Sequence, residues 1–277
     1  MPDLKTELKP PPPDPSILLS VPKPHVLLVT INRAKRMNSL PAPVQHYMHR
    51  VFEWFDLEPT LRVAVITGAG PKAFSAGQDL IELGERDPNS SEASSPISGF
   101  GGVSKRIGKK PVIAAVNGFA MGGGFEIVLN CDMTVASPTA TFGLPEALRG
   151  IYAGGGGPPR LVHNVGMPLA AEITMIGRTL SATEALQYNL INKISASLET
   201  VVEEALALAS KVANVSPDSI TVTRAALRET WETASVQRGN DLIDARYLRA
   251  LLETENSKEG LRAFKEKREP VWKAGKL

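Results

Sequence analysis

Hydrophobic and polar positions follow two different periods along this chain. Short apolar runs rich in β-branched residues predict strands, and most are closed by Gly, Pro or Asn. These runs cover residues 17–21, 26–31, 63–67, 112–116 and 133–136. A helical period appears after Pro41, where apolar residues recur three or four positions apart and predict an amphipathic helix. Its apolar face comprises Val44, Tyr47, Met48, Val51 and Phe55.

The order of these elements predicts an α/β fold. Strand, glycine turn and helix repeat through the first half of the chain, and from about residue 158 the pattern is mainly helical. We expect a Pro-rich disordered arm at residues 1–15, a core at residues 16–213 and a helical region at residues 214–277. Residues 84–102 lack periodicity and predict a long loop, and such loops are often functional.

Charge and composition exclude several classes of function. The chain carries 31 Lys and Arg against 29 Asp and Glu, which gives no reason to expect nucleic-acid binding. No apolar run approaches the ~20 residues of a membrane span, so we expect no membrane partner. The four histidines lack metal-binding spacing, and no metal site is expected. A single cysteine, Cys131, cannot form an internal disulfide and favours a reducing compartment.

The last three residues bear on location. Gly275-Lys276-Leu277 approaches the Ser-Lys-Leu address that the peroxisomal import receptor reads, with glycine in place of serine. We expect the tail after Trp272 to be free for such a receptor. The sequence therefore predicts a peroxisomal location, with a cytoplasmic one as the alternative.

Glycine-rich turns and two glutamates carry the candidate chemistry. Residues 122–124 are all glycine between a predicted strand and a helix, so free N–H groups there could bind a phosphate or a developing oxyanion. Glu126 and Glu146 each lie beside such a turn in apolar sequence. Either one alone could merely complement a helix dipole. Two together suggest paired carboxylates in an apolar cleft, where burial raises the pKa of a carboxyl group and one can donate a proton while the other accepts.

Three blocks resemble the signature of the crotonase (enoyl-CoA hydratase/isomerase) superfamily. They are residues 73–80, 117–126 and 142–146, in the family's order, with supporting matches at residues 33–40, 177–185 and 264–270. The resemblance covers roughly residues 16–272. It implies a spiral core of repeated ββα turns and a helical C-terminal trimerisation region, and hence a homotrimer or homohexamer.

The resemblance also implies residue roles. Backbone N–H groups of Ala76 and Gly123 match the oxyanion hole, and Glu126 and Glu146 match the two hydratase glutamates. An acyl-CoA is then the substrate, and no further cofactor is expected because coenzyme A is part of that substrate. The positions that match coenzyme A or substrate contacts are Lys35, Arg36, Gln78, Asp79, Leu80, Gly122, Tyr152 and Lys267.

The presence of both glutamates favours an enoyl-CoA hydratase, a hydro-lyase that adds or removes water reversibly. A Δ3,Δ2-enoyl-CoA isomerase, which needs only the later carboxylate, is one alternative. A biosynthetic dehydratase of a branched hydroxyacyl-CoA such as mevalonyl-CoA is another, and a non-catalytic scaffold is a third. A departure from the family pattern at Gln78 bears on the contact with the adenine end of coenzyme A. Departures at Tyr152-Ala153 and Pro158-Pro159 indicate an acyl group other than a simple straight chain.

Overall fold

Two sheets form the core of the chain, for which a computed structural model describes residues 6–85 and 95–277. The larger sheet has the order β1-β2-β3-β5-β7-β10, and the smaller has the order β4-β6-β8-β9. Strands β1 and β2 are antiparallel, as are β8 and β9, and the other neighbours are parallel. The strands are β1 Ile17–Lys23, β2 Val26–Ile31, β3 Val63–Gly68, β4 Ala73–Ser75, β5 Val112–Val116, β6 Phe119–Met121, β7 Met133–Ala136, β8 Thr141–Gly143, β9 Leu180–Ser181 and β10 Lys193–Ile194.

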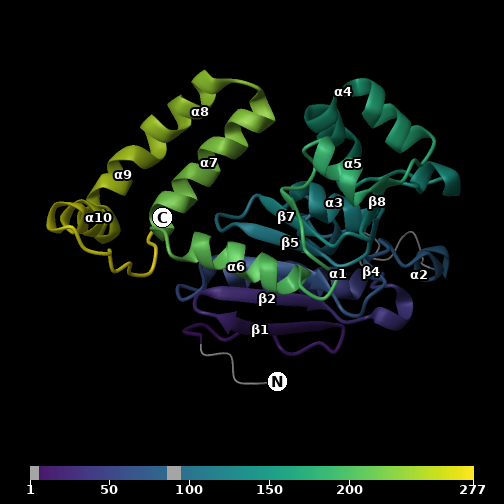
Figure 1. The fold of residues 1–277 in the computed structure, drawn as a ribbon, viewed down its shortest axis with the longest axis horizontal. Helices are drawn as coiled ribbons and strands as arrows, with labels where there is room; N and C mark the ends of the chain where they lie inside the picture. The colour runs from purple at the N-terminus through teal and green to yellow at the C-terminus, as the bar shows by residue number, and fades with distance from the viewer. Residues whose placement is uncertain (1–5, 86–94) are drawn as a thin grey trace.

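Helices surround these sheets and make up the C-terminal region. The α-helices are α1 Ala42–Leu57, α2 Leu80–Glu85, α3 Gly123–Asn130, α4 Gly157–Met175, α5 Ala182–Gln187, α6 Val201–Ala213, α7 Pro217–Thr233, α8 Val236–Leu242, α9 Leu248–Glu253 and α10 Glu255–Glu266. Short 3-10 turns lie at η1 Ala34–Arg36, η3 Phe100–Gly102 and η4 Glu146–Arg149, and a π-helical turn, η5 Ile243–Tyr247, separates α8 from α9. Helices α7 to α10 stand away from the sheets at the opposite end from α4 and α5 (Figure 1).

The large sheet is covered on both faces. Strands β3 and β5 are buried at every position, which is typical of parallel strands between two helical layers. The apolar face of α1 packs in one core with Phe74 and Phe125. Val201, Ala205 and Ala209 of α6 pack in the other with Val63 and Val65. The α/β prediction with a helical C-terminal region is thus confirmed.

Most predicted elements lie where the periodicity placed them. The strands at residues 26–31, 112–116 and 133–136 and the helix after Pro41 are all present. The first strand continues to Lys23, with an irregular register after Ser20. The helix expected over residues 236–254 is interrupted by η5. The predicted loop at 84–102 contains the end of α2 and all of η3, and its residues 86–94 lie outside the described part.

The N-terminal arm from residue 6 is held against α1. The backbone N–H of Leu8 donates to Glu58 Oε2 at 2.6 Å, and that of Glu7 donates to Oε1 at 3.2 Å. Trp54 Nε1 donates to the carbonyl of Leu8 at 3.1 Å. Glu58 is fully buried, and a buried carboxylate is costly without hydrogen-bond partners. The N–H groups of the arm supply such partners. Disorder was therefore the wrong expectation for residues 6–15.

The C-terminal tail is also held. The backbone N–H groups of Lys276 and Leu277 donate to Asp218 Oδ1 at 2.6 and 3.1 Å. Asn256 Nδ2 donates to the other oxygen of Asp218 at 2.7 Å, and Asp218 is only 1% exposed. The expectation of a free tail is wrong in this structure, because its last two N–H groups bind a buried carboxylate at the start of α7.

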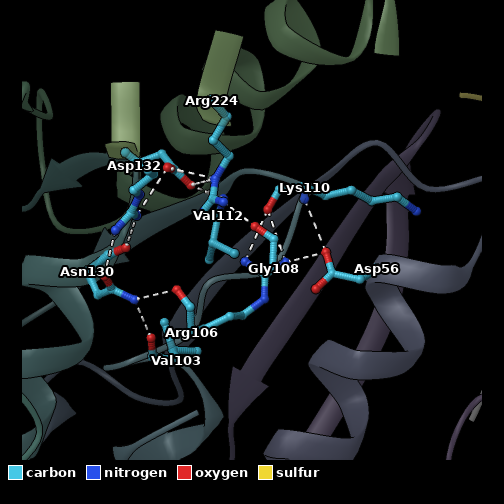
Figure 2. Close-up of polar contacts among 10 residues, drawn as sticks. Asp56, Val103, Arg106, Gly108, Lys110, Val112, Asn130, Asp132 and Arg224 are labelled. Atoms are coloured by element: carbon cyan, nitrogen blue, oxygen red, sulfur yellow. Dashed lines mark hydrogen bonds and ion pairs between the residues drawn. The ribbon is translucent and has the colours of Figure 1, made fainter. Parts of the chain in front are cut away.

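A buried ion-pair network joins α7 to the core (Figure 2). Arg224 Nε donates to both oxygens of Asp132, at 2.9 and 3.0 Å, and Arg228 Nη2 donates to Oδ1 at 3.2 Å. The N–H of Val112 donates to Oδ2 at 2.9 Å, and Arg224 also donates to the carbonyl of Gly108. Burial alone would raise the pKa of Asp132, but the two guanidinium groups outweigh it and hold the pKa below its usual value.

The first prediction concerns this network. Asp132→Ala removes the partner of the buried Arg224, so we expect a loss of about 3 kcal/mol in the free energy of unfolding, measured by urea titration. Glu253→Ala is the matched control, since its pair with Arg249 is largely exposed, and it should cost less than about 1 kcal/mol.

The pH dependence provides a second check on Asp132. Because its pKa is depressed in the folded state, its stabilisation is present above about pH 4 and is lost as the pH falls below that value. The difference in the free energy of unfolding between wild type and Asp132→Ala should therefore become smaller as the pH is lowered. A difference that is small at pH 7 would contradict a structural role for the pair.

Candidate active site

Two glycine turns meet at the carboxyl ends of the small parallel strands. Gly77 follows β4 with φ +87°, a conformation that favours glycine. A Cβ atom on Gly77 would lie 2.8 Å from the carbonyl oxygen of Met121 and 3.0 Å from the nitrogen of Gly123. The turn after β4 therefore touches the turn between β6 and α3, and β8 brings the segment that leads to Glu146 to the same edge.

A cavity of about 690 Å³ lies at this edge. From the first turn it is lined by Ala76, Gln78 and Leu80. Ligand sites of open parallel sheets commonly occupy this place, outside the carboxyl ends of the strands.

The other predicted residues in the cavity wall come from the second turn and from the segment after β8. These are Gly122, Gly123 and Glu126, and then Glu146 and Tyr152. The structure thus brings together eight of the twelve predicted site residues from sequence positions 76 to 152.

Glu126 is held in the first turn of α3. It is 3% exposed, and its Oε1 accepts a hydrogen bond from the N–H of Gly157 at 2.9 Å. Burial raises its pKa, and the N–H groups of Gly157 and Gly155 oppose that rise without cancelling it. A Cβ atom on Gly155 would lie 2.4 Å from Glu126 Oε2, so glycine is needed there for the loop to approach the carboxylate.

Glu146 lies directly after Pro145 at the start of η4. Burial raises its pKa to about 7, an effect partly opposed by its own backbone N–H and reinforced by the charge of Glu126. Its Oε2 is buried and has no hydrogen-bond partner among the described residues. A Cβ atom on Gly122 would lie 2.7 Å from its Oε1. The second carboxylate therefore also lies against the β6–α3 turn.

The backbone donors near these carboxylates differ from the expected pair. Gly123 is the first residue of α3 and has no capping side chain, so its N–H is free at the positive end of the helix. The N–H of Ala76, however, donates to the carbonyl of Met37 at 2.9 Å. The N–H of Gln78 has no acceptor within residues 6–85 and 95–277. The resemblance assigned the N–H of Ala76 to the oxyanion hole, but in this structure that N–H is already used in the bond to Met37.

Side chains on the first turn support its shape. Gln45 Nε2 donates to Gln78 Oε1 at 2.7 Å. Asp79 Oδ2 accepts from Arg33 Nη2 and from Ser39 Oγ, both at 3.3 Å. The carboxylate of Asp79 thus ties the turn to the segment before α1.

The remaining predicted residues do not line the cavity. Lys35 and Arg36 lie exposed on η1, and Lys267 lies exposed after α10. Of the cavity residues that the sequence did not single out, two contact the predicted chemical groups or act on their charge. Phe100 packs its ring against Gly123, and Lys105 contributes a charge that lowers the pKa of Glu126. Phe100 lies in the segment without periodicity and Lys105 follows shortly after it, so no local signal marked either residue.

Two further structural features, a metal cluster and a membrane-spanning helix, are absent from the described part of the chain. Residues 6–85 and 95–277 contain no cluster of His, Cys, Asp and Glu side chains suited to a metal ion. In the same ranges, no helix has the length and apolar character needed to cross a membrane.

Comparison with known proteins identifies the family. Residues 23–275 match the family model described as enoyl-CoA hydratase/isomerase. A mevalonyl-coenzyme A hydratase from Beauveria bassiana is 46% identical over 272 residues, which cover 94% of this chain and 95% of that relative. A mevalonyl-coenzyme A hydratase from Aspergillus fumigatus is 42% identical over 260 residues, covering 94% of this chain and 96% of that protein.

A solved structure shows the same fold. An enoyl-CoA hydratase from Bacillus anthracis superposes with a TM-score of 0.83 at 31% identity, covering 93% of this chain and 99% of the other. The crotonase-type fold that the signature blocks predicted is thereby confirmed. With the family match over residues 23–275, the chain belongs to the enoyl-CoA hydratase/isomerase family, the crotonase superfamily.

Proposed function

We propose that this enzyme adds water to, or removes it from, an acyl-CoA thioester with a branched, hydroxylated acyl group such as mevalonyl-CoA. The observation that carries the reaction type is the pair of carboxylates with raised pKa values, Glu126 and Glu146, in one cavity beside the N–H of Gly123. The substrate is supported by the two relatives named mevalonyl-coenzyme A hydratases, at 46% and 42% identity.

In the hydration direction, Glu126 acts as the base and Glu146 as the acid. The N–H groups at Gly157 and Gly155 stabilise ionised Glu126, which takes a proton from water as the water oxygen bonds to the β-carbon. The π electrons move toward the thioester, and Glu146, protonated below about pH 7, gives its proton to the α-carbon. Dehydration reverses each step, and solvent exchange restores the starting protonation of the pair.

Two backbone N–H groups stabilise the charge that develops on the thioester oxygen. Gly123 supplies one at the start of α3. We assign the other to Gln78 in place of Ala76, because the N–H of Ala76 already donates a hydrogen bond to the carbonyl of Met37. Fixed donors aimed at developing charge are among the largest contributions to catalysis.

The isomerase alternative requires only Glu146 and leaves Glu126 without a chemical task. A buried carboxylate that lines the cavity and binds a dedicated loop N–H favours the hydratase. The same pair argues against a non-catalytic scaffold.

We retain a homotrimer or homohexamer as part of the proposal, supported by Leu261 and Phe264 of α10, which are 70% and 87% exposed. In such an assembly Lys267 would approach the coenzyme A of a neighbouring subunit. Lys35 and Arg36 would lie near the phosphates of coenzyme A.

The second prediction tests the carboxylate pair. Glu126→Gln and Glu146→Gln should each lower kcat for hydration by roughly 10²–10⁴, the usual loss when a general acid or base is removed. Activity is measured with crotonyl-CoA and with the dehydrated form of mevalonyl-CoA, alongside isomerisation of a 3-enoyl-CoA. Glu253→Gln, on the exposed face of α9, is the control. Full hydration by Glu126→Gln would refute the two-glutamate mechanism. A wild type that isomerises a 3-enoyl-CoA but adds no water would replace the hydratase by the isomerase.

The third prediction follows from the pKa of Glu146. Hydration needs this carboxyl protonated, so kcat/KM should fall as the pH rises through about 7. It should also fall on the acidic side, where Glu126 becomes protonated. Glu146→Gln cannot lose a proton, so its residual activity should lack the alkaline limb, as a pH profile measured from 5 to 9 would reveal. A wild-type profile that is flat from pH 6 to 8 is incompatible with this assignment.

The fourth prediction concerns location. We propose peroxisomal import through Gly275-Lys276-Leu277, with the cytoplasm as the alternative. The structure adds a condition, since Asp218 binds the last two N–H groups. A fluorescent protein carrying the last twelve residues should enter peroxisomes, and an N-terminally tagged Asp218→Ala chain should enter more completely than the wild type. Diffuse fluorescence from the twelve-residue fusion, in cells that import a Ser-Lys-Leu control, would refute the proposal.

A further inference from the structure

Arg160 links the loop that binds Glu126 to the C-terminal helical region. It lies in the first turn of α4, and its Nη1 donates back to the carbonyls of Gly155 and Gly156 at 3.4 and 3.3 Å. A Cβ atom on Gly156 would lie 2.2 Å from that nitrogen, so the guanidinium group rests directly on the loop backbone. Gly156 has φ +98°, which suits glycine alone.

The outer side of the guanidinium group meets α7. Its Cζ lies 5.9 Å from the centre of the Trp231 ring, within the range of a cation–π interaction. The His163 ring, one turn further along α4, lies 5.0 Å from the same tryptophan. Trp231 thus covers two consecutive turns of α4 on the face that carries Arg160.

A single peptide group connects Arg160 with Glu126. The peptide between Gly156 and Gly157 accepts from Arg160 through its carbonyl and donates to Glu126 Oε1 through its N–H, at 2.9 Å. In a trans peptide these two groups point in opposite directions. Arg160 and Glu126 therefore lie on opposite sides of one rigid unit, and a cation on the carbonyl strengthens the donor on the other side.

The charges around Arg160 and Glu126 include both favourable and unfavourable ones. Arg160 and Lys105 both favour ionised Glu126, whereas the charge of Glu126 opposes the ionisation of Glu146. On the α7 side, Glu232 stabilises the charge of Arg160 and Arg228 opposes it. Arg160 is the member of this set that also contacts the loop backbone holding Glu126.

We propose that Arg160 is a positioning residue, which holds the Gly156–Gly157 peptide against Glu126 and so couples helix α7 to the catalytic carboxylate. This inference rests on the proposed role of Glu126 in hydration. It assigns a function in the site to a residue outside the cavity wall and to a helix that contributes no residue to that wall.

The test measures the ionisation of Glu126 directly and compares three arginine variants. Arg160→Gln removes the charge, Arg160→Lys keeps it, and Arg246→Gln removes a cation from the neighbouring cavity beside α7 without touching the loop. The pKa of Glu126 is read from the pH titration of 13C-labelled glutamate carboxyl signals, assigned by the signal lost in Glu126→Gln. Thermal unfolding, kcat and KM are measured on the same samples.

Arg160→Gln should raise the pKa of Glu126 by about one unit. On the acidic limb of the pH profile, below that pKa, the ionised fraction and therefore kcat should fall about tenfold, with KM changed less than twofold, whereas kcat at pH values where Glu126 stays ionised should change much less. Arg160→Lys should keep the pKa of Glu126 close to its wild-type value, and Arg246→Gln should leave that pKa unchanged. Trp231→Leu should shift the pKa in the same direction by a smaller amount, and it keeps the test available if Arg160→Gln does not fold.

Two results would overturn the inference. One is an unchanged pKa of Glu126 in a folded Arg160→Gln or Trp231→Leu protein. The other is an equal shift in Arg246→Gln, which would mean that general charge and not the loop contact is responsible. Because the titration needs no turnover, a wild type that hydrates no acyl-CoA would refute the proposed function separately, while a shift confined to the Arg160 and Trp231 variants would still support the coupling.

Discussion

The close approach of two backbone turns sets the geometry on which the rest of the site depends. Gly77 touches the carbonyl of Met121 and the nitrogen of Gly123 at distances that leave no space for a Cβ atom. Any larger residue would separate the end of β4 from the start of α3. The free N–H of Gly123 and the carboxylate of Glu126, one turn along that helix, would then move together relative to Gln78. The site is therefore built from backbone proximity first, and its side chains are added to that frame.

An asymmetric environment gives two chemically identical carboxyl groups different protonation behaviour. Burial raises the pKa of both glutamates, and burying a charge without partners is costly. Glu126 accepts a hydrogen bond from the N–H of Gly157, and this bond stabilises its ionised form. Glu146 Oε2 has no such partner in the described part of the chain, so protonation is its easier response. Separation of two pKa values by environment is a general way to obtain an acid and a base from one residue type.

Local pattern predicted five strands of the large sheet, the helix after Pro41, the glycine turns and both glutamates, because each is encoded by neighbouring residues. The strands of the small sheet have only two or three residues each, too few for a periodic signal. Local pattern also failed where the partner is distant in sequence. Met37 accepts the N–H of Ala76, and Glu58 and Asp218 hold the two terminal segments. None of these contacts leaves a periodic signal, since a buried carboxylate and a helix-capping one look alike in sequence. For the same reason the charge of Lys105 near Glu126 became visible only in three dimensions.

One face of α7 is linked to both ends of α3, the short helix that carries Glu126. Arg224, Arg228 and Trp231 are spaced i, i+4 and i+7, so they share a side of α7. The two arginines bind Asp132, just past the end of α3. Trp231 packs on Arg160, which supports the loop bound to Glu126 in the first turn of α3. A displacement of α7 would therefore act on Glu126 from two directions. Under the proposed coupling, a region that contributes nothing to the cavity wall would still influence the ionisation of a carboxylate inside it.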